Sequence, residues 1–108
     1  MEPGRKQITT YVTPSGRDFF QEWMRELKDR KGRAIIYNRI DRLAAGNPGN
    51  YRHLTDGMNE LKIDFGPGYR VYYAEDGKTL VILLCGGDKS TQHKDIARAK
   101  ECWAEYRS

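Results

Sequence analysis

The sequence predicts an α+β protein whose elements follow the order βααβββα. Two patterns favour this class. Apolar and charged residues alternate along Glu60–Ile63, as expected for a strand with one buried face. In the first half of the chain and again near its end, apolar residues instead recur at helical spacing. A length of 108 residues suits one domain, spanning 1–108, with one hydrophobic core.

A strand and a helix are expected at the N-terminus. Gln7–Val12 is rich in β-branched and aromatic residues and ends just before Pro14, so it is predicted to be the first strand. Thr13 or Ser15 can cap the following helix, which is expected to run to about Asp29. Its apolar residues share one side of the helix: Phe19, Phe20, Trp23, Met24 and Leu27.

A second helix follows a short break at 30–32, which favours two antiparallel neighbouring helices. Its apolar positions lie four and then three residues apart, at Ile36, Ile40 and Leu43, and Gly46 supplies a C-terminal stop. Residues 47–56 have no periodicity and are rich in Pro, Gly and Asn. This segment is therefore predicted to be a loop.

Three consecutive strands are predicted between residues 58 and 85. The first ends at the turn Gly66–Gly68, the second is Tyr69–Ala74, and a turn at 75–78 leads to the third. Leu80–Cys85 is uniformly apolar, which favours a central strand covered on both faces. Gly86-Gly87 is predicted to be a turn before a C-terminal helix. We expect a twisted, mainly antiparallel sheet packed against the helical hairpin and this last helix.

The composition limits the environment and the partners of the protein. Lys and Arg number 19 against 15 Asp and Glu, and the net charge of +4 fits a polyanionic partner such as RNA. Cys85 and Cys102 lack metal-ligand spacing and are expected to be buried thiols in a reducing compartment. Because no apolar run approaches ~18 residues and no secretory signal is present, we expect a soluble, cytoplasmic protein without membrane contact.

Four motifs resemble one bacterial family. They are E-L-K-I at 60–63, G-P-G-Y-R-V-Y-Y at 66–73, L-L-C-G-G-D-K-S-T-Q at 83–92 and D-I-x-x-A at 95–99. From about Ile8 to Trp103 the chain is similar to the RelE/HigB-type toxins of toxin–antitoxin pairs, and it is closest to their phage-derived, HigB-like branch, the addiction module killer proteins.

The resemblance implies a RelE-like fold and a small endoribonuclease that cuts mRNA, typically in the ribosomal A site. It also implies a helix-turn-helix antitoxin that suppresses the activity, with operator DNA bound only through that antitoxin. No metal or cofactor is expected.

RNA cleavage without a metal requires three events. The 2′-hydroxyl must lose a proton, the phosphorus must be stabilised as negative charge develops, and the leaving 5′-oxygen must gain a proton. The resemblance places Arg70 on the scissile phosphate, Lys62 at a basic position of the preceding strand, and Lys89 near a second basic position of the cleft. The alternatives are an ion pair of Arg70 with Glu60 or Asp64, and simple solvation of the two lysines.

Two further side chains are candidates for proton transfer. Glu60 stands where the best-known family members carry another lysine, so it is either a base or, more simply, the ion-pair partner of Lys62 or Arg70. His93 and His53 are the two histidines of the chain, and both are expected in or beside a loop. His93 is the stronger candidate, and the alternative is an ordinary surface histidine.

Aromatic and basic side chains are candidates for RNA contact. Tyrosine faces can stack on unpaired bases, unless the rings are part of the core. Arginines of the second helix can contact ribosomal RNA, and the alternative is a solvated helix face. The candidates are Tyr69, Tyr72, Tyr73, Arg33, Arg39, Arg42 and Lys94.

A second hypothesis for the whole protein is a non-catalytic basic module that binds RNA or the antitoxin without cutting. Two departures from the family pattern support it. The C-terminal catalytic tyrosine of the family has no clear match, because the corresponding position falls near Asp95, and Glu60 replaces the expected lysine.

Overall fold

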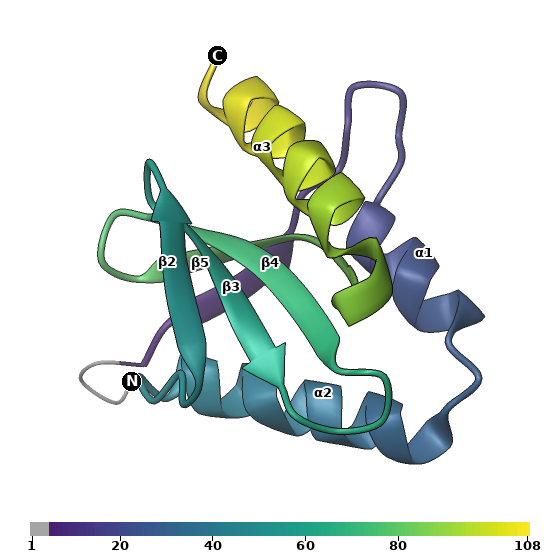
Figure 1. Ribbon diagram of the computed structural model, residues 1–108. Helices are drawn as coiled ribbons and strands as arrows, with labels where there is room; N and C mark the ends of the chain where they lie inside the picture. The colour runs from purple at the N-terminus through teal and green to yellow at the C-terminus, as the bar shows by residue number, and fades with distance from the viewer. Residues whose placement is uncertain (1–4) are drawn as a thin grey trace.

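The computed structural model describes residues 5–108 and confirms an α+β architecture (Figure 1). It contains one more strand than predicted, so the order is βααββββα. The strands are β1 (Gln7–Thr10), β2 (Tyr51–Thr55), β3 (Met58–Ile63), β4 (Tyr69–Asp76) and β5 (Leu80–Asp88). The helices are α1 (Phe19–Glu26), α2 (Arg30–Ala44) and α3 (Gln92–Arg107), and the short 3-10 helix η1 (Lys89–Thr91) precedes α3.

The five strands form one mixed sheet with the order β1-β5-β4-β3-β2. β1 is parallel to β5, whereas the other neighbouring pairs are antiparallel. β5 therefore lies inside the sheet, and Val81–Leu84 are buried. The predicted central strand at Leu80–Cys85 is confirmed, and its apolar residues follow one another without a break because both of its faces are covered.

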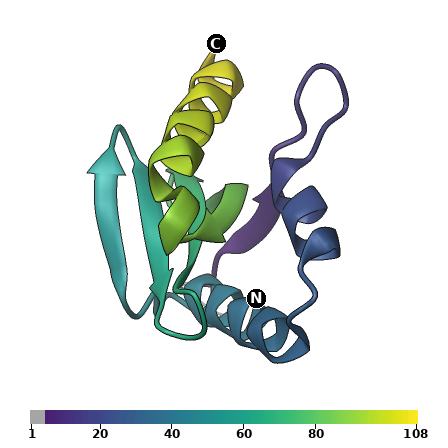
Figure 2. The same ribbon diagram turned by 45° about the vertical axis from the view of Figure 1, so that its right-hand side comes forward.

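Helices cover both faces of the sheet (Figures 1 and 2). α1 and α2 pack on one face around a core that includes Phe20 and Leu61, and α3 packs on the other around a core that includes Trp103. Side chains alternate between these layers along β4, so Arg70 and Tyr72 share the α3 side. This side carries the site described below.

α1 begins and ends differently from the prediction. Its cap is Asp18, whose carboxylate accepts a hydrogen bond from a backbone N–H of the first turn at 3.0 Å. The predicted caps Thr13 and Ser15 are therefore wrong. α1 ends at Glu26 rather than near Asp29, because the Asp29 carboxylate caps α2 instead.

β2 corrects the prediction that residues 47–56 form a loop. This edge strand pairs with β3 alone, and the side chains of Tyr51, Arg52 and His53 are exposed, so the alternation typical of a half-buried strand is missing. Thr55 pairs with Met58 across a two-residue turn in which Asp56 and Gly57 have φ values of 51° and 85°. Asp-Gly is a preferred sequence for such turns and would have indicated the hairpin.

Gly86-Gly87 is not a turn, because both glycines lie within β5. Neither has a positive φ, so conformational freedom does not explain them. A Cβ on Gly86 would overlap the indole ring of Trp23, and a Cβ on Gly87 would overlap the Asp95 carboxylate. The two glycines therefore allow α1 and α3 to approach opposite faces of the same strand.

The predicted state of the cysteines is confirmed, since Cys85 and Cys102 are buried free thiols. Within residues 5–108, no helix combines the length and the apolar character needed to cross a bilayer.

Candidate functional site

Two basic side chains face each other across the β3–β4 hairpin. The strand register places Lys62 directly opposite Arg70 on the α3 side of the sheet. Like charges at directly opposed positions of an antiparallel pair repel and destabilise the sheet. An arrangement that disfavours folding in this way is suited to an anionic ligand.

Lys89 completes a group of three cations. It is the first residue of η1 and follows β5 immediately. A cleft of about 240 Å³ is lined by Asn50, Lys62, Asp64, Gly68, Arg70 and Lys89. The three cations that the sequence predicts to act together are therefore brought into one cleft.

The turn before β4 places Gly68 beside two of the cations of the cleft. Gly68 has a φ of +83°, and a Cβ at this position would lie 3.5 Å from Arg70 Nη1 and 3.5 Å from Lys89 Cβ. The left-handed backbone is therefore the reason for glycine here, because a Cβ would make only ordinary van der Waals contacts with the two cations.

Arg70 is nearly buried, with 8% of its surface exposed. Its Nη1 donates hydrogen bonds of 3.1 Å to the backbone carbonyls of Gly68 and Tyr69, which fix the guanidinium, while Nε has no partner. Among residues 5–108, no carboxylate forms an ion pair with Arg70, so the alternative of a salt bridge to Glu60 or Asp64 is wrong. A buried cation without a counter-charge is expensive unless an anion binds beside it.

Glu60 belongs to the neighbouring row of the same sheet face and is completely buried. Arg52 Nη2 of β2 lies 3.1 Å from Glu60 Oε1, and Gln92 Nε2 of α3 donates to Glu60 Oε2 at 2.8 Å. The predicted ion pair of Glu60 with Lys62 or Arg70 is therefore wrong, and the cation beside Glu60 is Arg52. The phenol of Tyr72 lies in the same row, and burial followed by the nearby Glu60 carboxylate raises the pKa of Tyr72.

Comparison with known proteins identifies the family of this chain. The model of the phage-derived, Gp49-like protein family (DUF891) matches residues 22–103. The chain belongs to the Gp49-like family. An uncharacterized protein of Haemophilus influenzae is 53% identical to it over 94 residues, which are 87% of this chain and 89% of that protein. The Gp49-like family is linked to toxin–antitoxin modules.

The three tyrosines of β4 in this Gp49-like protein are core residues and do not present their faces to bases. Tyr69, Tyr72 and Tyr73 are 4%, 0% and 1% exposed, because β4 is covered on both sides. The predicted stacking of Tyr69 and Tyr72 on RNA is therefore wrong for this conformation. The Tyr69 hydroxyl donates to the Asp29 carboxylate at 2.7 Å, and burial together with this hydrogen bond raises the pKa of Tyr69 to about 12.

The arginines of α2 do not line the cation cleft. Arg39 donates to the backbone carbonyls of Lys62, Pro48 and Asn50 at 2.8, 2.9 and 2.9 Å, so its guanidinium holds the segment before β2 against β3. Burial lowers the pKa of Arg39. Arg33 borders a separate groove between α1 and α2, and Arg42 is exposed.

The predicted residues at the start of α3 also lie outside the cleft. His93 and Lys94 are both exposed, and His53 Nδ1 lies 3.1 Å from Asn59 Oδ1 on the α1 and α2 side of the sheet. Asp95, near which the RelE/HigB resemblance places the catalytic tyrosine, is buried and accepts a hydrogen bond from the Thr91 hydroxyl.

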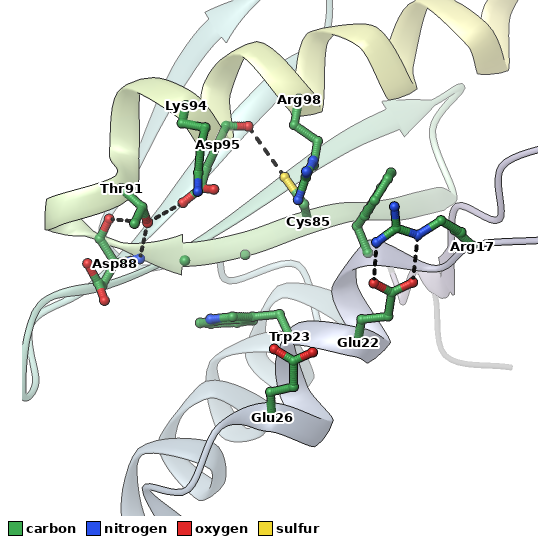
Figure 3. A pocket seen from close by; sticks show the side chains of 13 residues that line it. Arg17, Glu22, Trp23, Glu26, Cys85, Asp88, Thr91, Lys94, Asp95 and Arg98 are labelled. Carbon is green, nitrogen blue, oxygen red and sulfur yellow. Dashed lines mark hydrogen bonds and ion pairs between the residues drawn. The ribbon is translucent and has the colours of Figure 1, made fainter.

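Lys94 instead borders a second groove, of about 350 Å³, between α1 and α3 (Figure 3). Arg17 and Glu22 form an ion pair of 2.7 Å there, and the guanidinium of Arg98 lies 4.3 Å from the ring centre of Phe19. The cations Arg17 and Arg98 are thus engaged with groups of the protein itself.

Sequence reasoning missed three residues beside the cation cleft, namely Asn50, Arg52 and Gln92. Two of them precede or lie in β2, which the sequence analysis assigned to a loop. The Asp56-Gly57 turn could have indicated the hairpin, but the strand register shifts between His53 and Thr55, so the turn alone does not give the residues opposite Glu60 and Lys62.

Proposed function

We propose that this Gp49-like protein is the toxin of a toxin–antitoxin pair and cleaves mRNA as a metal-independent endoribonuclease of the RelE/HigB type. The observation that carries the proposal is Arg70, a nearly buried cation without a carboxylate partner that shares one cleft with Lys62 and Lys89. Three convergent cations on rigid elements suit a phosphate at which negative charge develops.

The three cations of the cleft and the neighbouring Glu60 have separate roles in this mechanism. The 2′-hydroxyl attacks the adjacent phosphorus, and the Arg70 guanidinium stabilises the charge that builds on the phosphoryl oxygens. Lys62 and Lys89 flank Arg70 from two different elements. One of these lysines, as a neutral amine, accepts the proton of the 2′-hydroxyl, and the other, as an ammonium, donates a proton to the leaving 5′-oxygen. Glu60 has no exposed surface and positions Arg52 and Gln92 rather than acting as the base.

The proposed substrate is mRNA on the ribosome, with activity in the cytoplasm under control of a helix-turn-helix antitoxin. The net charge of +4 supports a polyanionic partner. A second candidate function is a non-catalytic module that binds RNA or the antitoxin. The observation that favours it is Asp95, which is buried near the position where the RelE/HigB resemblance places the catalytic tyrosine.

Growth and transcript mapping test the proposal together. Arg70→Gln keeps most of the side-chain volume and a donor for the two carbonyls but removes the charge, and Lys89→Ala removes an exposed ammonium. Both variants are expected to relieve growth arrest on induction, while the control Lys100→Ala, an exposed lysine of α3, keeps it.

New 5′ ends within codons are expected in cells that express the wild type and not in cells that express Arg70→Gln. Arrest without new 5′ ends would support the non-catalytic module. Full toxicity of both folded cleft variants would overturn the assignment of the cleft.

A further inference from the structure

Arg52 lies beside the cation cleft, and its side chain is only partly engaged in contacts with the protein. Its Nη2 contacts Glu60 Oε1 at 3.1 Å, while half of its side chain, 50%, remains exposed. Glu60 in contrast is completely buried. The carboxylate therefore attracts the guanidinium as an ion pair without a hydrogen bond to Oε1, and the exposed N–H groups stay available to a ligand.

Arg52 lies opposite Glu60, in the row next to the cleft and two residues after the cleft residue Asn50. Asn50 lines the cleft and accepts a hydrogen bond of 2.9 Å from the Lys62 backbone N–H through its carbonyl. Residues two positions apart on a strand, such as Asn50 and Arg52, are separated by about 7 Å along the strand. This spacing is similar to the distance between successive phosphates of an extended single strand. Arg52 thus lies on the strand next to Lys62, displaced by about 7 Å along the sheet, and two strands away from Arg70.

A buried carboxylate is a costly way to hold an arginine if stability alone is served, since an apolar pair of similar volume is often at least as stable. Here the carboxylate also receives Gln92 Nε2 at 2.8 Å, which ties the start of α3 to the same point. Fixing a long, flexible side chain before the ligand arrives reduces the entropy lost on binding.

We infer that Arg52 binds a phosphate of the RNA that flanks the scissile one and that Glu60 and Gln92 position its guanidinium. The inference rests on the proposed function and extends it, because the substrate becomes a single-stranded RNA that runs from the cation cleft across β2. Arg52 touches substrate but not the reacting atoms, so it sets affinity and register on the RNA.

The salt dependence of binding measures this contact directly. The probe is a 2′-O-methylated mRNA oligonucleotide, which cannot be cleaved, either free or placed in the A site of a programmed ribosome. Loss of one phosphate contact to a single strand lowers the slope of log K against log salt concentration by about 0.7. We expect this change for Arg52→Gln and no change for Arg107→Gln, an exposed control arginine at the end of α3.

Two more variants separate binding from stability. Arg52→Gln leaves the buried Glu60 charge without its cation, so its thermal midpoint is expected to fall. Combining Arg52→Gln with Glu60→Gln removes both charges and is expected to restore the midpoint but not the slope. Glu60→Gln alone keeps Arg52 and is expected to keep the slope while affinity falls several-fold, because the guanidinium is no longer held.

The outcomes also distinguish this inference from the proposed function. If Arg70→Gln weakens binding but Arg52→Gln leaves slope and affinity as in the wild type, the role of Arg52 is overturned and the cleft assignment stands. If Arg70→Gln has no effect, or if the wild type binds neither probe, the proposed function itself fails and this inference fails with it.

Discussion

Substitution of Gly87 by alanine gives opposite results under two explanations of the Gly86-Gly87 pair. Gly87 has no positive φ, so backbone freedom is not required there. If conformation alone mattered, Gly87→Ala would restrict the unfolded chain and stabilise the protein by about 0.4–1 kcal/mol. If close packing is the reason, the added methyl group would collide with Asp95 and Thr91 at the start of α3.

The magnitude follows from the atoms that must move. Overpacking a filled site costs about 1–3 kcal/mol. Displacing the Asp95 carboxylate, which is 6% exposed, also breaks its hydrogen bond from Thr91 and leaves a buried polar group unpaired, at a further cost of about 1–3 kcal/mol. We therefore expect the free energy of unfolding to fall by about 2–6 kcal/mol, which is a large part of a typical domain's stability.

Urea unfolding followed by circular dichroism measures the change. Adding Asp95→Ala to Gly87→Ala makes room for the methyl group, so the double variant is expected to lose less than the sum of the two single changes. Gly77→Ala is the matched control, because its site is open but its φ of +70° predicts a loss from strain of about 1–2 kcal/mol. A Gly87→Ala protein at least as stable as the wild type would refute the packing explanation.

Three further predictions concern groups around the sheet. The Tyr69 hydroxyl, and then the Gly32 N–H, lower the pKa of the Asp29 carboxyl in the folded protein. The ionised carboxylate therefore stabilises the fold above the pKa that Asp29 has in the unfolded chain, and this stabilisation is lost as pH falls through the pKa of the folded protein. Acid unfolding curves of Asp29→Asn should accordingly show a weaker pH dependence than those of the wild type. Burial raises the pKa of the Cys85 thiol, and we expect iodoacetamide to alkylate it only after urea unfolding, as peptide mass mapping would show. Arg39→Ala removes the donors for three carbonyls and should lower the free energy of unfolding by about 1–3 kcal/mol in urea titrations, whereas Arg42→Ala, an exposed neighbour, should not.

The elements that could be predicted are those in which one physical requirement dominates the local sequence. β5 is apolar at consecutive positions because it is covered twice, and α2 shows its buried face as Ile36, Ile40 and Leu43. β2 could not be found in this way. An edge strand paired on one side only, with three exposed side chains in succession, has no apolar pattern to detect.

The candidate site was predictable to the extent that it depends on one hairpin. The turn between β3 and β4 fixes the pairing of Lys62 with Arg70, and the end of β5 brings Lys89 to the same place. Arg52 and Gln92 come from an edge strand and from the start of α3, so their approach to Glu60 depends on tertiary packing. The same reason explains the wrong prediction that Tyr72 stacks on RNA, because the sequence of β4 does not reveal that helices cover both of its sides.

The buried charged side chains differ in whether the protein itself supplies their partners, and this difference distinguishes structural from functional groups. Glu60 is buried and has a cation and an amide donor, and the buried Asp95 has a hydroxyl donor. Arg70 is buried to a similar degree, yet backbone carbonyls satisfy only some of its donors and none of its charge. Because the fold can match interior charges elsewhere, the unmatched Arg70, with Lys62 placed opposite it, indicates a position where the counter-charge arrives with the ligand.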